Sequence, residues 1–150
     1  MTLPRLTCAV VALMLITGAP AGAQAPQRPA SPDALSPDVI AQAVRRYITT
    51  QTAKHGRFWM HDAVENRSLA LQFVRVHADR VGSLSADLHF ASVEFRQPDA
   101  TTLWVDVFMR GATADLLEPE RLAVQEIGGK ARYTWHRQNG MWRQQPADQP

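Results

Sequence analysis

The hydrophobic pattern of the chain begins with one amphipathic segment. Between residues 39 and 48, apolar side chains recur mainly at intervals of three and four, which is the spacing of one helix face. Ser36-Pro37-Asp38 is typical of a helix start, because it offers a capping hydroxyl, a proline without an N–H, and an acid at the positive end of the helix dipole. Lys54-His55-Gly56 is typical of a helix end. The pattern predicts a helix from Pro37 to Gly56, whose buried face holds Val39, Ile40, Ala43, Val44, Tyr47 and Ile48.

After Gly56 the pattern changes to short runs of β-branched and aromatic residues separated by turn residues. Gly128-Gly129 and Asn139-Gly140 are typical of tight hairpins, because these residues tolerate positive φ. Such short connections require antiparallel neighbours, since a parallel crossover needs a dozen residues or more. A helical turn is expected over residues 115–118. We expect seven strands, over residues 57–63, 69–78, 87–96, 102–110, 122–127, 131–138 and 141–143.

These elements predict an α+β domain, in which one N-terminal helix packs on a curved antiparallel meander sheet of about six or seven strands. This order resembles the cystatin-like class. It also resembles the nuclear-transport-factor-2-like class, which usually begins with more helix. Val76-His77, Val105-Asp106-Val107-Phe108 and Arg132-Tyr133-Thr134-Trp135 are similar to segments of small exported bacterial proteins. The resemblance implies export and fold.

Residues 1–23 have the features of a secretory signal peptide. Arg5 precedes an apolar run over residues 6–17, and Ala21-Gly22-Ala23 supplies the small residues of a cleavage site. We expect cleavage after Ala23, delivery to the periplasm or the medium, and no stable membrane anchor after cleavage. The single cysteine, Cys8, lies within this segment, so the mature chain has no disulfide and no thiolate ligand.

The remaining chain suits a single domain over residues 37–144. Residues 24–36 are rich in proline and predict a disordered linker, and residues 145–150 predict a flexible tail. Sixteen basic and 14 acidic residues leave a formal net charge of only +2. This balance argues against a nucleic-acid partner, because a protein that binds nucleic acid would carry its lysines and arginines clustered on one face.

The segment 102–110 alternates between two kinds of side chain, which lie on opposite faces of a strand. We expect the aliphatic set to face the helix. The other face would hold an acid and an arginine beside two aromatics, a groove suited to a ligand with a flat apolar part and a polar end. The alternative, which we favour, is that these aromatics cover a crossing strand or a dimer partner, while the acid and the arginine pair or point to water. The aliphatic set is Leu103, Val105, Val107 and Met109, and the second set is Trp104, Asp106, Phe108 and Arg110.

The segment 69–78 breaks its own alternation, because Leu69, Leu71 and Phe73 share a parity with the polar residues 75, 77 and 79. Either a bulge near Val74 switches the faces, or the strand extends beyond the core. We favour the second alternative, in which Arg75, His77 and Asp79 form a solvated strand end. The functional alternative places His77 beside Asp106, as an acid–base pair able to move a proton.

Motifs for other chemistry are absent from the sequence. The five histidines lie on different segments, and there is no HExxH motif, G-x-S-x-G elbow or phosphate loop. We therefore expect no metal and no cofactor. Tyr133, Trp135 and Trp142 accompany several basic residues near the C-terminus. They predict either an aromatic-paired hairpin, which we favour, or a stacking platform for a sugar or peptide.

Three functions remain open. The leading hypothesis is a noncatalytic exported domain that binds an envelope protein or a small molecule. Its ligand-binding residues would be Trp104, Asp106, Phe108, Arg110 and His77. The second is an acid–base enzyme in which His77 and Asp106 are catalytic and Trp104 forms a wall of the pocket. The third is a self-assembly module, in which the open sheet face pairs with a copy of itself as a homodimer.

Overall fold

The predicted helix is present, and both of its ends are capped by the expected residues. The computed structural model describes residues 35–147, so the predicted signal peptide and most of the predicted linker lie outside the described residues. Helix α1 spans Pro37–His55, and the Ser36 hydroxyl accepts a hydrogen bond from the Val39 N–H at 3.4 Å. Gly56 ends the helix with a φ of 75°, and its N–H donates to the Thr52 carbonyl. Glycine suits this left-handed position because it has no Cβ.

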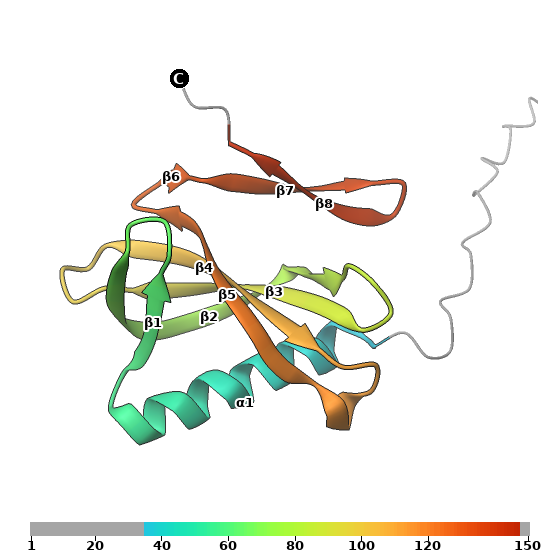
Figure 1. The fold of residues 1–150 in the computed structure, drawn as a ribbon, viewed down its shortest axis with the longest axis horizontal. Helices are drawn as coiled ribbons and strands as arrows, with labels where there is room; N and C mark the ends of the chain where they lie inside the picture. Colours follow the sequence, from blue (N-terminus) through green and yellow to red (C-terminus); the bar gives the residue numbers. More distant parts are fainter. Residues whose placement is uncertain (1–34, 148–150) are drawn as a thin grey trace, which may run out of the picture. The chain divides into compact units, whose positions relative to one another are not determined.

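Six strands follow as one antiparallel meander, in which each strand pairs with the next one along the chain. A separate hairpin of two strands completes the fold, and Figure 1 shows α1 on one side of the sheet and this hairpin on the other. The α+β class and the single N-terminal helix are therefore confirmed. The meander strands are β1 (Phe58–Asp62), β2 (Arg67–Ser83), β3 (Leu88–Arg96), β4 (Thr102–Arg110), β5 (Glu118–Ile127) and β6 (Lys130–Ala131), and the hairpin strands are β7 (Tyr133–Gln138) and β8 (Met141–Pro146).

The main core lies between α1 and the sheet. Ile40, Val44 and Ile48 of α1 are buried in the same cluster as the four aliphatic residues of β4, as the alternation predicts. Tyr47 is only half-buried, and its ring packs edge-on against Phe58 with 5.8 Å between the ring centroids. The helix therefore occupies one face of the sheet and leaves the second face of β4 to other partners.

Strand β2 differs from the favoured expectation. Its pairing with β3 shifts register between Phe73 and Arg75, which places a bulge at Val74. The bulge changes the phase of the alternation. Val76 therefore lies in the core, whereas unbroken alternation would place Arg75 and His77 there. A second irregularity separates Val76 from Val81, which is buried again. The expectation of a strand that extends beyond the core is therefore wrong, because the core continues along β2 after the bulge, and His77 is largely covered. Arg75 and Asp79 are exposed, as expected.

The bounds of other strands also differ from those predicted. Strand β5 begins four residues before the predicted strand over 122–127, and a 3-10 turn (η1, Ala114–Leu116) precedes it, close to the predicted helical turn. Strand β8 pairs as far as Pro146, and the Ala147 N–H donates to the Arg132 carbonyl at 3.1 Å. Residues 145–147 therefore belong to the hairpin rather than to the predicted tail. Within residues 35–147, no helix has both the length and the apolar character needed to cross a membrane.

Candidate functional site

The second face of the sheet is covered by the chain's own C-terminal hairpin. Trp135 of β7 stacks on Phe90 of β3, with 4.2 Å between the ring centroids and 21° between the planes. Trp142 of β8 meets the same ring edge-on at 5.4 Å. Its indole also lies so close to Gly82 that a Cβ there would fall 2.2 Å from the Trp142 Nε1. Cross-strand packing, rather than an open stacking platform, therefore explains Trp135 and Trp142.

Asp106 anchors this hairpin to the sheet. Its carboxylate is fully buried and accepts three hydrogen bonds, from the Ser92 hydroxyl at 2.5 Å, the Tyr133 hydroxyl at 2.7 Å and the Trp135 Nε1 at 2.6 Å. Burial raises the pKa of Asp106 above its usual value, although the three hydrogen bonds act in the opposite direction. Asp106 thus has the environment of a structural carboxylate.

His77 lies elsewhere on this face. Its Nε2 is 3.3 Å from the Glu94 Oε2, without the geometry of a hydrogen bond, and its ring stacks on Trp104 with 4.1 Å between the centroids. The Arg80 guanidinium covers Trp104 at 4.6 Å. The imidazole is thus placed against Glu94, whereas the partners of Asp106 are the hydroxyls and the indole described above. The structure does not bring His77 and Asp106 together as an acid–base pair.

The five residues predicted to bind a ligand do not line one open groove. His77 and Trp104 lie at one end of the face, while Phe108 is fully buried and tilts against Trp135, close to Asp106. Arg110 lies at the other end of β4, where its guanidinium pairs with Asp87 and Glu120, each at 2.6 Å. The hairpin thus occupies the central part of the predicted groove.

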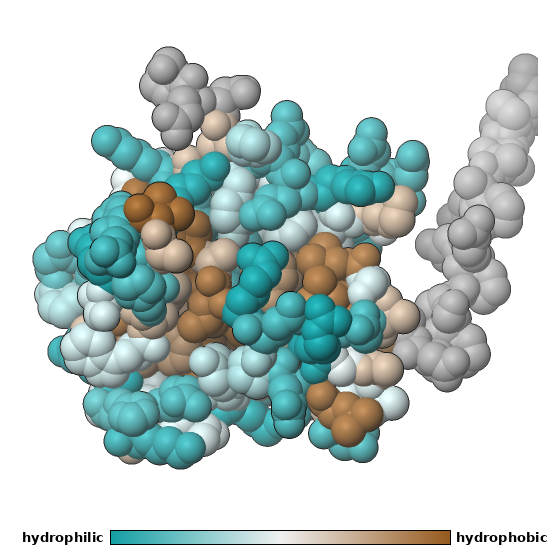
Figure 2. Space-filling view, in the orientation of Figure 1, coloured by the Kyte–Doolittle hydropathy of each residue, from teal (hydrophilic) through white to brown (hydrophobic). Residues whose placement is uncertain are grey.

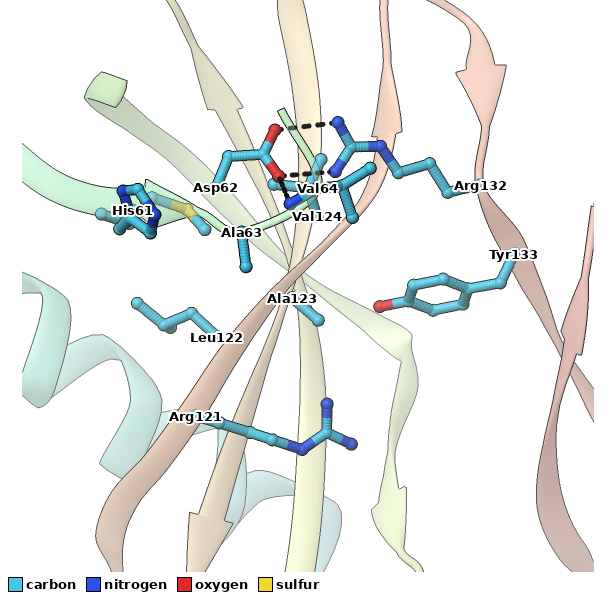
Figure 3. Close-up of a pocket in the computed structure, with 11 residues that line it drawn as sticks. His61, Asp62, Ala63, Val64, Arg121, Leu122, Ala123, Val124, Arg132 and Tyr133 are labelled. Carbon is cyan, nitrogen blue, oxygen red and sulfur yellow. Dashed lines mark hydrogen bonds and ion pairs between the residues drawn. The ribbon is translucent and has the colours of Figure 1, made fainter. Parts of the chain in front are cut away.

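A different site lies beside the hairpin, between β1 and β5. It is a pocket of about 290 Å³, with an apolar wall and several polar groups (Figure 3). Strands β1 and β5 are separated by three strands in the sheet order, but the curvature of the sheet brings them close enough to line one pocket. In Figure 2, apolar surface is visible in the region between these two strands. The lining residues are Met60, His61, Asp62, Ala63, Val64, Arg121, Leu122, Ala123, Val124, Arg132 and Tyr133.

One side of the pocket is closed by an ion pair. The Arg132 guanidinium donates to both oxygens of Asp62, at 2.7 and 2.8 Å, and also to Glu65 at 2.9 Å. Asp62 is 2 % exposed, and the hydrogen bonds from Arg132 lower its pKa. This pair ties the end of β1 to the residue between β6 and β7, and therefore holds the pocket wall in place.

Arg121 and Tyr133 form the other polar part. The Arg121 guanidinium carbon lies 3.5 Å from the centroid of the Phe108 ring, and among residues 35–147 no carboxylate pairs with this side chain. Figure 3 shows the guanidinium and the Tyr133 hydroxyl directed towards the space around Ala123. These two side chains connect the pocket with the face of β4 that holds Asp106 and Phe108, because Arg121 contacts Phe108 and Tyr133 donates to Asp106.

Sequence reasoning missed Asp62 and Arg121. Asp62 is 70 positions away from Arg132 in the chain, and no local pattern indicates that the two meet. Arg121 lies just before the strand predicted over residues 122–127, so the sequence pattern did not assign its side chain to either face of the sheet. The apolar residues of β5 contain the only signal for this wall, and they are equally consistent with an ordinary core strand.

Metal ligands do not cluster in the described part of the chain: no group of three His, Asp or Glu side chains in residues 35–147 is arranged to hold an ion. His89, for example, is buried between the Ser83 hydroxyl at 2.7 Å and the Gly111 carbonyl at 2.9 Å, so it connects the end of β2 to the residue that follows β4. Comparisons of the chain with protein-family models, curated proteins and solved structures found no match.

Proposed function

We propose that this protein is a noncatalytic exported binding module, which holds a small molecule with an apolar body in the pocket between β1 and β5. The observation that carries the proposal is the pocket itself, because its 290 Å³ and largely apolar wall match the lower end of the range for small-molecule sites. Its walls come from well-packed strands and are braced by the ion pair of Asp62 with Arg132. A preformed site of this kind loses little free energy in ordering when it binds a ligand.

Binding is better supported than acid–base catalysis. The carboxylate of Asp106 is fully buried and accepts three hydrogen bonds, so a substrate has no direct path to it. Asp62, the carboxylate that lines the pocket, is bonded to Arg132 through both oxygens. The hypothesis of an enzyme that uses His77 and Asp106 stays a prediction without a supporting contact, and so does self-assembly through the sheet face.

The test uses three probes that share a six-carbon apolar body: hexan-1-ol, hexanoate and hexylamine. Each is titrated into ¹⁵N-labelled protein, recovered from a bacterial host that expresses the full chain, and the amide shifts are followed by NMR. We expect at least one probe to cause saturable shifts centred on residues 63, 64, 123 and 124. Ligands of this size reach dissociation constants on the order of 1 mM. Intact mass spectrometry of the same sample tests export, because cleavage after Ala23 leaves a chain that begins at Gln24.

A pocket-filling variant provides the control. Ala123→Leu adds three heavy atoms at the centre of the pocket and should weaken binding of the probe at least tenfold. Ala78→Leu adds the same atoms at an exposed position of β2 outside the pocket and should leave binding unchanged. The proposal fails if no probe shifts the pocket amides, or if Ala123→Leu binds as tightly as the wild type.

A further inference from the structure

The polar end of the pocket contains a cation without a counter-charge. On the basis of the proposed function, we infer that the ligand carries an anionic head group of the carboxylate type, and that Arg121 binds this head. Asp62 and Glu65 already engage Arg132. Within residues 35–147, Arg121 is the only cationic pocket residue that no carboxylate engages.

The position of Arg121 suits recognition of a carboxylate. Its guanidinium lies over the Phe108 ring at 3.5 Å, and Phe108 is fully buried and therefore held in place by the core. Stacking uses the flat face of the guanidinium and leaves the N–H groups along its edge free to donate. A carboxylate can accept two of these N–H groups in parallel, which is the strongest pairing open to an arginine side chain.

The difference in charge between the two sides of the pocket determines the orientation of the ligand. On the side opposite Arg121, Arg132 pairs with Asp62 and Glu65, and Glu65 also pairs with Arg67 at 2.7 Å, so two arginines balance the two carboxylates and that side has no excess charge. Figure 3 shows Arg132 and Arg121 on opposite sides of the pocket, with Ala123 between them. An anionic head therefore gains more from Arg121, whose charge is not balanced by a carboxylate, than from the Arg132 side, while the apolar body lies against the wall between them.

Tyr133 adds a directional feature. Its hydroxyl hydrogen is already donated to Asp106 at 2.7 Å, so towards the pocket its oxygen is available only as an acceptor. Arg121 provides donors and Tyr133 provides an acceptor. A head group that combines a carboxylate with a neighbouring hydroxyl or amide N–H fits both of them.

The experiment compares the affinities of hexanoate, hexan-1-ol and hexylamine for the wild type and for Arg121→Gln, by the NMR titration described above. A charge-assisted hydrogen bond should make hexanoate bind at least tenfold more tightly than hexan-1-ol to the wild type, with hexylamine weakest. Arg121→Gln should reduce this preference to less than threefold. Arg46→Gln removes the same charge from the exposed face of α1 and should retain the full preference.

The outcomes separate the two proposals. If hexan-1-ol and hexanoate bind the pocket equally well, or if Arg121→Gln retains the preference, the inference about the head group is wrong while the binding module stands. If none of the probes binds the pocket, both fail. Arg121→Lys keeps the charge but loses the planar fork, and an intermediate preference in this variant supports the inference even if the glutamine variant folds poorly.

Discussion

Replacing Asp106 tests whether one buried acceptor attaches the hairpin to the sheet. In Asp106→Ala, three donors lose their partner. The Tyr133 hydroxyl borders the pocket and can turn to water, but the Ser92 hydroxyl is fully buried and the Trp135 Nε1 faces the sheet. Each donor left buried without a partner costs about 1–3 kcal/mol. Removal of a buried charge offsets part of this cost, so we expect a net loss of about 3 kcal/mol in the free energy of unfolding.

Asp106→Asn is the matched comparison. With its oxygen towards Tyr133 and Trp135, the asparagine amide can donate its N–H to the Ser92 oxygen, because a hydroxyl both donates and accepts. All three contacts are then retained without the cost of burying a charge. At neutral pH we expect the free energy of unfolding of the asparagine variant to equal that of the wild type or to exceed it by up to about 1 kcal/mol.

Urea unfolding followed by tryptophan fluorescence measures both variants. With a urea dependence of about 1–3 kcal/mol per molar, the loss in Asp106→Ala lowers the midpoint by about 1–3 M. The pH dependence is an independent check. Because the pKa of Asp106 is raised in the folded state, the wild type gains stability from this group below the usual pKa of 3.8 and loses it as pH rises through the raised value. The advantage of the asparagine variant should therefore grow with pH and then level off.

Two results would refute this reasoning. If the asparagine variant is as unstable as the alanine variant at neutral pH, the negative charge rather than the acceptor geometry holds the hairpin. If the difference between the wild type and the asparagine variant is constant from about pH 3 to about pH 8, the pKa of Asp106 is not raised by folding.

Two further substitutions test other contacts. Gly82→Ala should displace the indole of Trp142, since the added Cβ would lie 2.2 Å from its Nε1. We expect the free energy of unfolding in urea to fall by about 1–3 kcal/mol and the tryptophan fluorescence to change. Unchanged values would contradict the close packing. Asp62→Asn should lower the free energy of unfolding by about 2 kcal/mol, because it breaks the ion pair with Arg132. Since folding lowers the pKa of Asp62, this loss should be complete above the usual pKa and should disappear as pH falls through the lowered pKa. An equal cost at all pH values, measured by urea unfolding between about pH 2 and about pH 7, would argue against the ion pair.

The candidate site was only partly accessible from the sequence. Alternation along β4 correctly separated the aliphatic face from the face of Asp106 and Phe108, because neighbouring side chains on a strand point in opposite directions. It could not show whether that second face is open. The answer depends on where the hairpin of β7 and β8 folds back, and this is decided by contacts between rings such as Phe90 and Trp135, which are 45 positions apart in the chain.

The bulge at Val74 illustrates the same limit. The sequence indicated that the pattern of β2 breaks near this residue, and it offered two explanations. The choice between them depends on whether the core continues beyond the break. It does continue, because β3 extends far enough to pair with β2 up to Ser83. Strand pairing over such distances is not encoded in the residues next to the bulge.

The sequence by itself determined the helix from Pro37 to His55, the antiparallel order of the strands and the tight turns at Gly128-Gly129 and Asn139-Gly140. These features depend on capping groups, periodicity and φ preferences within a few residues. Only the tertiary structure decided that the hairpin covers Asp106 and that β1 and β5 form a pocket with Arg121 at one end. The physical reason is that the curvature of the sheet and the burial of a few aromatic rings bring together residues that no local pattern connects.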